Sequence, residues 1–344
     1  MKNPKGFLWA GMQAGIKPNR KDLALVYSDA PCSAAGCFTQ NLAKAAPVID
    51  AEKRLPSDGI RAVVINSGNA NALTGPEGLE DVRTVCDAVG KALQIPISAV
   101  VSASTGVIGH RLPAYKIVAA APSLAASLKG DAMPAAEAIM TTDTRVKVAS
   151  RMVQIDGKDV TLACICKGSG MIAPSLATMI AVVATDCAIT PPMLGGALNK
   201  AMRRSFNALT VDGDMSTNDV VFALANGLAG NAPIADPGPA LETFGAALDD
   251  ICKQMAKEIA ADGEARPSCS TSRSKVLRPR TSRSIWPRPA PGPAWSRPRF
   301  SGRIRTGGEC CPRWARAPGP RGTRSIRRKR VYLFRKLPSM TARR

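Results

Sequence analysis

The sequence predicts an α/β fold, because short apolar strands alternate along it with amphipathic helices. Residues 60–66 form a β-branched, mostly apolar run that is typical of a buried strand. A helical pattern follows, and its apolar face carries Val82, Val85, Val89 and Leu93. The alternation continues through predicted strands at 99–103, 146–155 and 159–166 and predicted helices at 113–128, 190–206 and 241–259.

The N-terminal elements have recognisable boundaries. Residues 21–28 and 35–38 are predicted to be short strands, joined by the turn-rich segment 29–32. Thr74 and Glu77 have the spacing of a capping box, which predicts that the first long helix begins there with a side-chain cap.

The later elements are bounded in the same way. Asp156-Gly157 predicts a tight hairpin between two alternating strands, and Thr190 followed by two prolines predicts a helix start. Residues 135–140 favour a short helix, and 220–224 favour either a helix or a strand. The last helix ends at 260–264, where the organised sequence stops.

The formal net charge of +21 is concentrated at one end of the chain. Residues 265–344 contain 23 Lys and Arg and one acidic residue, Glu309, which leaves 24 basic and 25 acidic residues in 1–264. The tail is built of Arg, Pro, Ser and Gly without helix or strand periodicity. Such a segment buries too little apolar surface to offset its chain entropy, so we expect it to be largely disordered.

Three interpretations compete for this tail. A basic nucleic-acid-binding arm fits its charge, but tryptophan beside proline, as at Trp286, is unusual for one. A flexible linker does not fit the charge density. Translation of GC-rich coding sequence in a shifted frame explains both the composition and the sharp boundary, and we favour it. DNA binding that is steeply salt-dependent and disappears on deletion of the tail would support the first interpretation instead.

Composition also limits the classes of function. The ten cysteines form no CxxC pair, no apolar stretch follows the first residues as in a signal peptide, and no apolar run reaches the roughly 18 residues of a membrane span. We therefore expect a cytoplasmic protein with reduced thiols and no membrane partner. The single histidine, His110, excludes a histidine-based triad and a multi-histidine metal site. Asp212, Asp214 and Asp219 lack calcium-loop spacing, so we predict no metal.

Two loops that follow predicted strands are candidate binding sites. Residues 67–72, after the first buried strand, are small and can present backbone N–H groups to a ligand. Residues 104–109 follow the next strand and contain Thr105 and Gly106. Strand ends are where α/β proteins place their sites, although Thr105-Gly106 alone is equally consistent with an ordinary turn.

Thr178 lies inside the apolar run 176–184, directly after the small residue Ala177. A buried hydroxyl without a hydrogen bond costs roughly 1–3 kcal/mol, so this threonine needs a partner or a function. On the pattern alone, a β-branched residue of a buried strand or helix that bonds a nearby carbonyl explains it. The alternative is a nucleophile, freed as a new N-terminus by cleavage of the Ala177–Thr178 bond, with its own α-amino group as base.

Several motifs together resemble those of the glutamate/ornithine N-acetyltransferase family of arginine biosynthesis. Residues 167–174 with 177–179 are similar to the self-cleavage and nucleophile segment of that family. Further similar motifs, in the family's order, stand at 11–17, 38–41 with 45–47, 66–71, 104–109, 141–144 and 210–219. The likeness covers residues 1 to about 264 and favours the nucleophile interpretation of Thr178.

The resemblance implies a fold and an activity. The fold is an α/β arrangement of layered sheets and helices that resembles N-terminal-nucleophile hydrolases. The activity is an acyltransferase, a glutamate N-acetyltransferase that cleaves itself before Thr178 and passes acetyl from N-acetylornithine to glutamate through an acetyl-threonine. Acetyl-CoA as a second donor, with amino-acid N-acetyltransferase activity, stays open; no other cofactor is implied.

The resemblance also implies roles for individual residues. Thr105 and Gly106 match the oxyanion hole, Thr144 and Lys167 match substrate contacts, and Glu264 matches an active-site glutamate. Thr178 and Glu264 count among the substrate contacts as well.

The resemblance divides the chain into an α-chain region, 1–177, a partial β-chain region, 178–264, and the non-family tail, 265–344. It implies a heterotetramer of two α and two β chains. After Asp262-Gly-Glu264 the sequence departs from the family. An aminopeptidase or amidase with an N-terminal threonine is the alternative enzyme; it would pass the acyl group to water rather than to glutamate.

Overall fold

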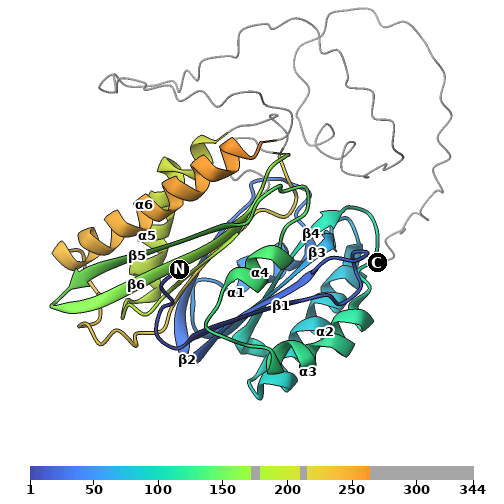
Figure 1. Ribbon diagram of the computed structural model, residues 1–344, viewed down its shortest axis with the longest axis horizontal. Coiled ribbons are helices and arrows are strands. Elements are labelled where there is room, and N and C mark those ends of the chain that lie inside the picture. The colour runs from blue at the N-terminus through green and yellow to red at the C-terminus, as the bar shows by residue number, and fades with distance from the viewer. Residues whose placement is uncertain (172–178, 210–214, 264–344) are drawn as a thin grey trace, which may run out of the picture.

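The computed structural model describes residues 1–171, 179–209 and 215–263 and contains a mixed α/β core (Figure 1). The strands are β1 Phe7–Met12, β2 Leu23–Phe38, β3 Ser57–Asn69, β4 Val100–Val107, β5 Lys147–Ile155, β6 Lys158–Lys167, β7 Ile180–Thr185 and β8 Val220–Ala225. The helices are α1 Ala46–Arg54, α2 Gly75–Leu93, α3 Ala114–Ala126, α4 Met133–Ala138, α5 Pro191–Arg204 and α6 Pro239–Ala261, with short 3₁₀ turns at Ile97–Ala99 and Phe206–Ala208.

The strands form one sheet that folds back on itself into two layers. Their order is β4-β3-β2-β8-β7-β6-β5, with β1 added beside β2; β3–β4 and β7–β8 are parallel and the other neighbours antiparallel. Val63 and Val101 of β3 and β4 share one core cluster with Val182 and Phe222 of β7 and β8, although these strand pairs are not neighbours in the sheet. The two halves of the sheet therefore pack face to face.

Helices cover the outer face of each layer. Val82 and Val85 of α2 pack with Val64 of β3, whereas Leu198 of α5 and Ile251 of α6 belong to the cluster formed by β5–β8. In Figure 1, α5 and α6 lie on one flank of the molecule and α2 and α3 on the opposite flank. The layered α/β class predicted from the sequence is confirmed.

Strand β2 joins the two layers. Its first part pairs with β3 and its second part with β8, and the register is irregular between Tyr27 and Cys32. The sequence predicted two short strands separated by a turn, and that prediction was wrong: the turn-like residues form an irregularity inside one 16-residue strand. An irregular register bends a strand without ending it, which lets β2 serve both layers.

Two other local predictions were wrong or incomplete. Thr74 makes no side-chain cap hydrogen bond. Its hydroxyl donates to Asn71 Oδ1 (2.8 Å) in the loop before α2, so this hydroxyl does not cap the helix as the capping box predicted. Strand β1 was missed, because only its last two residues, Gly11 and Met12, were considered, and only as the start of the 11–17 motif.

The remaining element predictions are confirmed. β5 and β6 form the predicted hairpin, and Asp156 and Gly157 both have positive φ (50° and 70°), as its tight turn requires. α5 begins after Thr190 with proline in its first turn. Residues 220–225 form a fully buried strand, which settles the helix-or-strand alternative.

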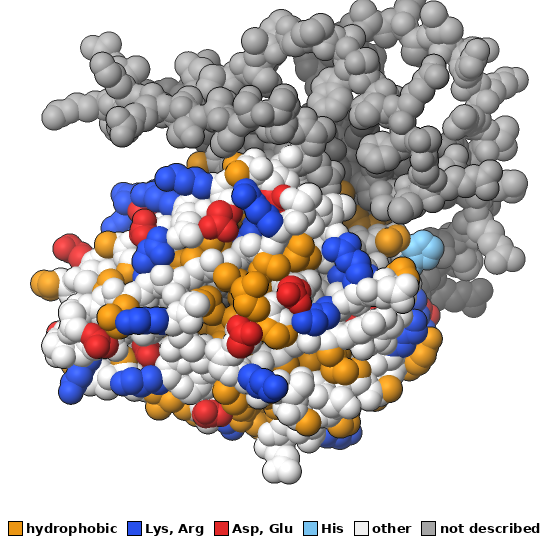
Figure 2. All heavy atoms as spheres, in the orientation of Figure 1, with side chains coloured by type: hydrophobic (Ala, Val, Ile, Leu, Met, Phe, Trp, Pro, Cys, Tyr) orange, Lys and Arg blue, Asp and Glu red, His pale blue; other side chains and the backbone are white. Residues whose placement is uncertain are grey.

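The surface of the described part carries charges of both signs. Figure 2 shows Lys and Arg side chains interspersed with Asp and Glu across the face in view. This agrees with the nearly balanced charge of residues 1–264. Within the described ranges, no helix is both long and apolar enough to cross a membrane.

Candidate functional site

The predicted oxyanion pair lies where the parallel strands β3 and β4 end together. Thr105 pairs with Ser67 and is 5% exposed, and Gly106 pairs with Gly68. Gly106 has φ +136°, and a Cβ at this position would lie 2.3 Å from the carbonyl carbon of Gly68. Only glycine allows the two strand ends to approach so closely. The backbone of the Thr105-Gly106 pair is therefore held in a fixed place.

Polar side chains fix the loop beside this pair. The hydroxyl of Ser104 lies 2.6 Å from Asn66 Oδ1, and Asn66 Nδ2 donates to the carbonyl of Asn69 (2.8 Å). Asn69 Oδ1 in turn accepts the backbone N–H of Asn71 (2.8 Å). The side chains of the 66–71 motif thus hydrogen-bond both within the loop and to neighbouring segments, as the Ser67 hydroxyl does to the carbonyl of Ala138 (2.5 Å), which makes the loop a rigid edge of the site.

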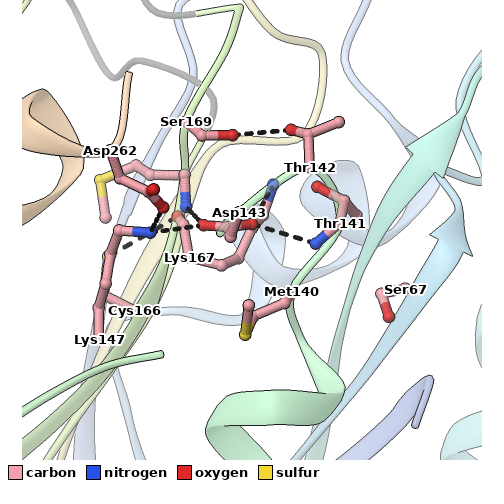
Figure 3. Close-up of polar contacts among 12 residues, drawn as sticks. Ser67, Met140, Thr141, Thr142, Asp143, Lys147, Cys166, Lys167, Ser169 and Asp262 are labelled. Carbon is pink, nitrogen blue, oxygen red and sulfur yellow. Dashed lines mark hydrogen bonds and ion pairs between the residues drawn. The ribbon is translucent and has the colours of Figure 1, made fainter. Parts of the chain in front are cut away.

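Lys167, the predicted substrate contact, is the last residue of β6 and is only 2% exposed. Its Nζ lies 3.8 Å from Oδ2 of Asp143, which belongs to the 141–144 motif (Figure 3). The structure therefore brings together two motifs that are more than twenty residues apart in the sequence. A buried ammonium group at a strand end is suited to binding a carboxylate.

Asp143 is the centre of a buried polar cluster. Its carboxylate accepts hydrogen bonds from the backbone N–H of Gly168 (2.6 Å), the backbone N–H of Thr141 (3.1 Å) and Nζ of Lys147 (2.9 Å). Burial raises the pKa of Asp143, but the charges of Lys167 and Lys147 and these hydrogen bonds outweigh it, and the pKa falls to about 2. Asp143 is therefore ionised at neutral pH.

The same cluster ties the end of α6 to the start of β5. Lys147 is fully buried, and its Nζ also donates to Oδ2 of Asp262 (2.5 Å), the residue that ends α6. Figure 3 shows the Lys147 ammonium group between the carboxylates of Asp143 and Asp262. Burial raises the pKa of Asp262, but its hydrogen bonds to Lys147 and Thr144 outweigh burial, and the pKa falls below its ordinary value.

Thr144, the second predicted substrate contact, belongs to this structural link. Its backbone N–H donates to Asp262 Oδ2 (3.1 Å), and its hydroxyl donates to Asp262 Oδ1. Its hydroxyl hydrogen is thus engaged within the protein. A role for Thr144 in binding substrate stays a prediction.

Lys17 is a further cation beside these groups. Its Nζ donates to the carbonyl of Met140 (2.8 Å), and its aliphatic stem covers Gly68, where an added Cβ would meet Lys17 Cγ at 2.8 Å. Burial and the charge of Arg20 lower the pKa of Lys17 to about 8. Lys17 therefore connects the end of β3 with the segment that leads into the 141–144 motif.

Sequence reasoning gave no role to Lys17, Lys147 or Asp262. Lys147 occupies an inward position in an alternating strand, and a charged residue at such a position is a usable signal. Asp262 could be recognised only as a helix end, because its partners are more than a hundred residues away.

The remaining predicted residues lie outside the described ranges: Ala177 and Thr178 at the cleavage position, and Glu264. The nearest described neighbour of Thr178 is Met179, whose backbone N–H donates to Asp219 Oδ1 (3.0 Å). Among the described residues there is no group of three or more His, Cys, Asp or Glu side chains that could hold a metal ion. Their seven cysteines are free and buried.

Comparison with known proteins places the chain in a family. The model of the ArgJ family matches residues 8–272. An "Arginine biosynthesis bifunctional protein ArgJ" from Thermotoga neapolitana is 46% identical over 264 residues, which cover 76% of this chain and 66% of that protein. A protein of the same name from Nitratidesulfovibrio vulgaris is 49% identical over 265 residues, covering 76% of this chain and 67% of its own length.

Among solved structures, the crystal structure of an arginine biosynthesis bifunctional protein ArgJ from Bacillus halodurans is 35% identical, with a TM-score of 0.48. The match covers 51% of this chain and 92% of the Bacillus halodurans chain. The chain spans about two thirds of the length of the curated relatives that it matches. Family membership follows from the match over residues 8–272 and from the identities to the curated relatives. The chain belongs to the ArgJ family.

Proposed function

We propose that this protein is a self-cleaving N-acetyltransferase of arginine biosynthesis, which moves acetyl from N2-acetyl-L-ornithine to L-glutamate. Membership of the ArgJ family supports the class of activity. The observation that carries the proposal for these residues is the pairing of β6 with β7. Lys167 pairs with Ile180, and Met179, the residue joined to Thr178, directly precedes β7. A buried lysine therefore lies beside the strand that begins just after the proposed nucleophile.

Self-cleavage is proposed as an N→O acyl shift followed by hydrolysis. The hydroxyl oxygen of Thr178 attacks the carbonyl carbon of Ala177, the C–N bond between the two residues breaks, and the hydroxyl proton passes to the departing nitrogen. Water then cleaves the resulting ester and leaves a carboxylate on Ala177 and a free hydroxyl and amine on Thr178.

Acetyl transfer follows the same chemistry in two steps. The Thr178 hydroxyl takes acetyl from N-acetylornithine and releases ornithine as an amine, and the amine of glutamate then takes acetyl from the threonine ester. Thr105 and Gly106 are proposed to donate hydrogen bonds to the oxyanion of each tetrahedral intermediate. Removing one such donor costs about 10²–10³-fold in rate in other enzymes.

Other residues are proposed to hold the substrates. Lys167 suits the α-carboxylate that ornithine and glutamate share, and Thr144 and Glu264 complete the set that the family resemblance suggests. A heterotetramer of two α and two β chains, acetyl-CoA as a second donor and a cytoplasmic location belong to the same proposal. They rest on the resemblance to the family.

The sheet provides a reason why cleaved pieces would stay together. β6 lies before the proposed cleavage position and β7 and β8 after it, and six residue pairs join β6 to β7. Cleavage at 177/178 would therefore leave the two pieces paired within one sheet. They should separate under denaturing conditions and migrate together under native ones.

The test is intact-mass analysis of the purified chain, as wild type, Thr178→Ala and Thr185→Ala. We expect wild type and Thr185→Ala to yield two pieces, 1–177 and 178–344, and Thr178→Ala to remain whole. Thr185 is a matched control because it is a buried threonine of β7 whose hydroxyl donates to the carbonyl of Thr161 (2.8 Å). Splitting of Thr178→Ala would exclude Thr178 as the agent.

A second assay separates transferase from hydrolase. Split protein is given N-acetylornithine with and without glutamate, and N-acetylglutamate and acetate are measured. Formation of N-acetylglutamate that depends on glutamate supports the transferase. Release of acetate at the same rate in both reactions would support the alternative, an aminopeptidase or amidase that passes acyl groups to water.

A further inference from the structure

Asn218 and Asp219, the two residues before β8, make buried contacts that none of the proposed roles explains. Asn218 is 5% exposed, and its Nδ2 donates to the carbonyls of Ser104 (2.7 Å) and Ala70 (2.6 Å). Its Oδ1 accepts a hydrogen bond from the hydroxyl of Thr217 (2.6 Å). The side chain of Asn218 is therefore fully engaged, and it holds the end of β4 at the residue before Thr105.

Asp219 makes the second contact. It is fully buried, its Oδ1 accepts the backbone N–H of Met179 (3.0 Å), and its carbonyl accepts the backbone N–H of Thr39 (3.0 Å). Its second carboxyl oxygen, Oδ2, is buried without a hydrogen-bond partner. An orphaned carboxyl oxygen in a protein interior is costly, which makes a purely structural role for this side chain a poor explanation.

Together these contacts connect two distant parts of the sheet. In the strand order, β3, β2 and β8 separate β4 from β7. Ser104 directly precedes Thr105, and the nitrogen of Met179 is the atom that joins it to Thr178. Two consecutive side chains therefore fix the backbone beside the oxyanion pair and the backbone beside the nucleophile.

We propose that Asn218 and Asp219 position the nucleophile of this protein against its oxyanion hole. Asn218 holds β4, and Asp219 holds the peptide nitrogen that follows Thr178. The inference rests on the proposed function, because it assigns Thr178 and the Thr105-Gly106 pair the roles given above. Asp219 acts through Met179 and is therefore a positioning residue.

The burial of Asp219 favours the neutral form of its carboxyl group. Burial raises the pKa of Asp219 well above its usual value. The hydrogen bond from Met179, the hydroxyls of Ser216 and Thr39 and the charge of Lys167 lower this pKa, but burial outweighs them. A protonated carboxyl accepts through one oxygen and donates through the other. Asparagine has the same shape and the same pair of functions, so Asp219→Asn should preserve the role and Asp219→Ala should remove it.

The first arm of the experiment measures the rate of self-cleavage by intact mass after fresh purification. We expect Asp219→Ala to slow splitting about 100-fold, as a misplaced reacting group does, and Asp219→Asn to stay within about 3-fold of wild type. Asn226→Ala is the matched control: Asn226 is a buried asparagine at the other end of β8, and its Nδ2 donates to the carbonyl of Lys5 (2.9 Å). It should split like wild type.

Two outcomes of this arm would overturn the inference. Splitting of Asp219→Ala at the wild-type rate would show that the contact with Met179 has no effect on the nucleophile. Equal slowing in Asp219→Asn and Asp219→Ala would show that ionisation, rather than positioning by a neutral group, is what matters.

The second arm tests positioning without any cleavage. In a Thr178→Ala chain labelled with ¹⁵N-methionine, hydrogen exchange of the Met179 amide is followed by NMR. Asp219→Ala should speed this exchange at least about 10-fold, with Asp219→Asn and Asn226→Ala close to the parent. Unchanged exchange in Asp219→Ala would contradict the inference. If the wild-type chain never splits, the proposed self-cleavage fails, and the Met179 exchange decides the positioning role alone.

Discussion

Asp143 and Asp219 are both buried beside the candidate site, but their surroundings differ in one respect. Asp143 is paired with Lys147 at 2.9 Å and faces Lys167 at 3.8 Å, whereas Asp219 accepts a backbone N–H and leaves one oxygen unpaired. The pKa of Asp143 falls to about 2 despite its burial, and burial raises the pKa of Asp219 well above its usual value. The pKa values of two buried aspartates in one protein are thus shifted in opposite directions.

The difference indicates different roles. In the Asp143 cluster, Lys147 is paired with both Asp143 and Asp262, as a structural link between α6 and β5 requires. Asp219 has no comparable compensation, and uncompensated buried carboxyls gather where chemistry is done. We infer that the first cluster builds the scaffold of the site and that Asp219 serves its reaction. The predictions below use Thr178→Ala chains, so that the polypeptide stays whole.

Removing the central cation should have the largest effect. Lys147→Met keeps the length of the side chain but leaves Asp143 and Asp262 buried without their ammonium partner. Breaking a buried pair in this way costs about 3–5 kcal/mol of unfolding free energy, which urea unfolding at pH 7 would measure.

Lys253→Met is the matched control for this variant. Lys253 pairs with Asp249 on the exposed side of α6, with 45% of its side chain exposed. An exposed pair of this kind is worth less than about 1 kcal/mol. Equal losses in Lys147→Met and Lys253→Met would mean that the buried cluster does not stabilise the link between α6 and β5.

Asp143→Asn should have an intermediate effect that depends on pH. Because the folded-state pKa of Asp143 is lowered from 3.8 to about 2, its stabilisation is present above pH 4 and is lost as the pH falls towards 2. That shift corresponds to about 2 kcal/mol. The difference in unfolding free energy between parent and Asp143→Asn should therefore shrink between pH 5 and pH 2, and a constant difference would refute the assignment.

More of the fold than of the candidate site could be predicted from the sequence. Local signals identified the hairpin at Asp156-Gly157 and the start of α5 at Thr190, because turn and cap chemistry depend on neighbouring residues. The same signals failed at residues 29–32, where turn-like residues form an irregularity inside β2. Whether such residues end a strand or bend it depends on which strands pair on either side, and no local pattern contains that information.

At the site, the sequence indicated residue types but not their partners. The resemblance singled out Lys167 and Thr144, and the structure connects them through Asp143, Lys147 and Asp262. The contacts of Asp262 join residues more than a hundred positions apart, so spacing cannot reveal them. Asp219 was considered only as a metal ligand and as the last residue of the 210–219 motif, because its contact with Met179 exists only when β7 and β8 lie side by side.

The smallest expected effect, with the opposite sign, belongs to Asp219→Asn. The folded-state pKa of Asp219 is raised above the unfolded value of 3.8, so its stabilisation is complete below that pH and is lost as the pH rises through the folded-state pKa. Asparagine stays neutral and keeps the acceptor for Met179. Urea unfolding should thus find the parent and Asp219→Asn alike near pH 4 and the variant more stable near pH 8. Since Lys167 is the cation that opposes this shift, Lys167→Met should widen the gap between parent and variant at pH 8. A variant that is less stable than its parent at both pH values would show that Asp219 is ionised in the folded protein, and the contrast with Asp143 would then disappear.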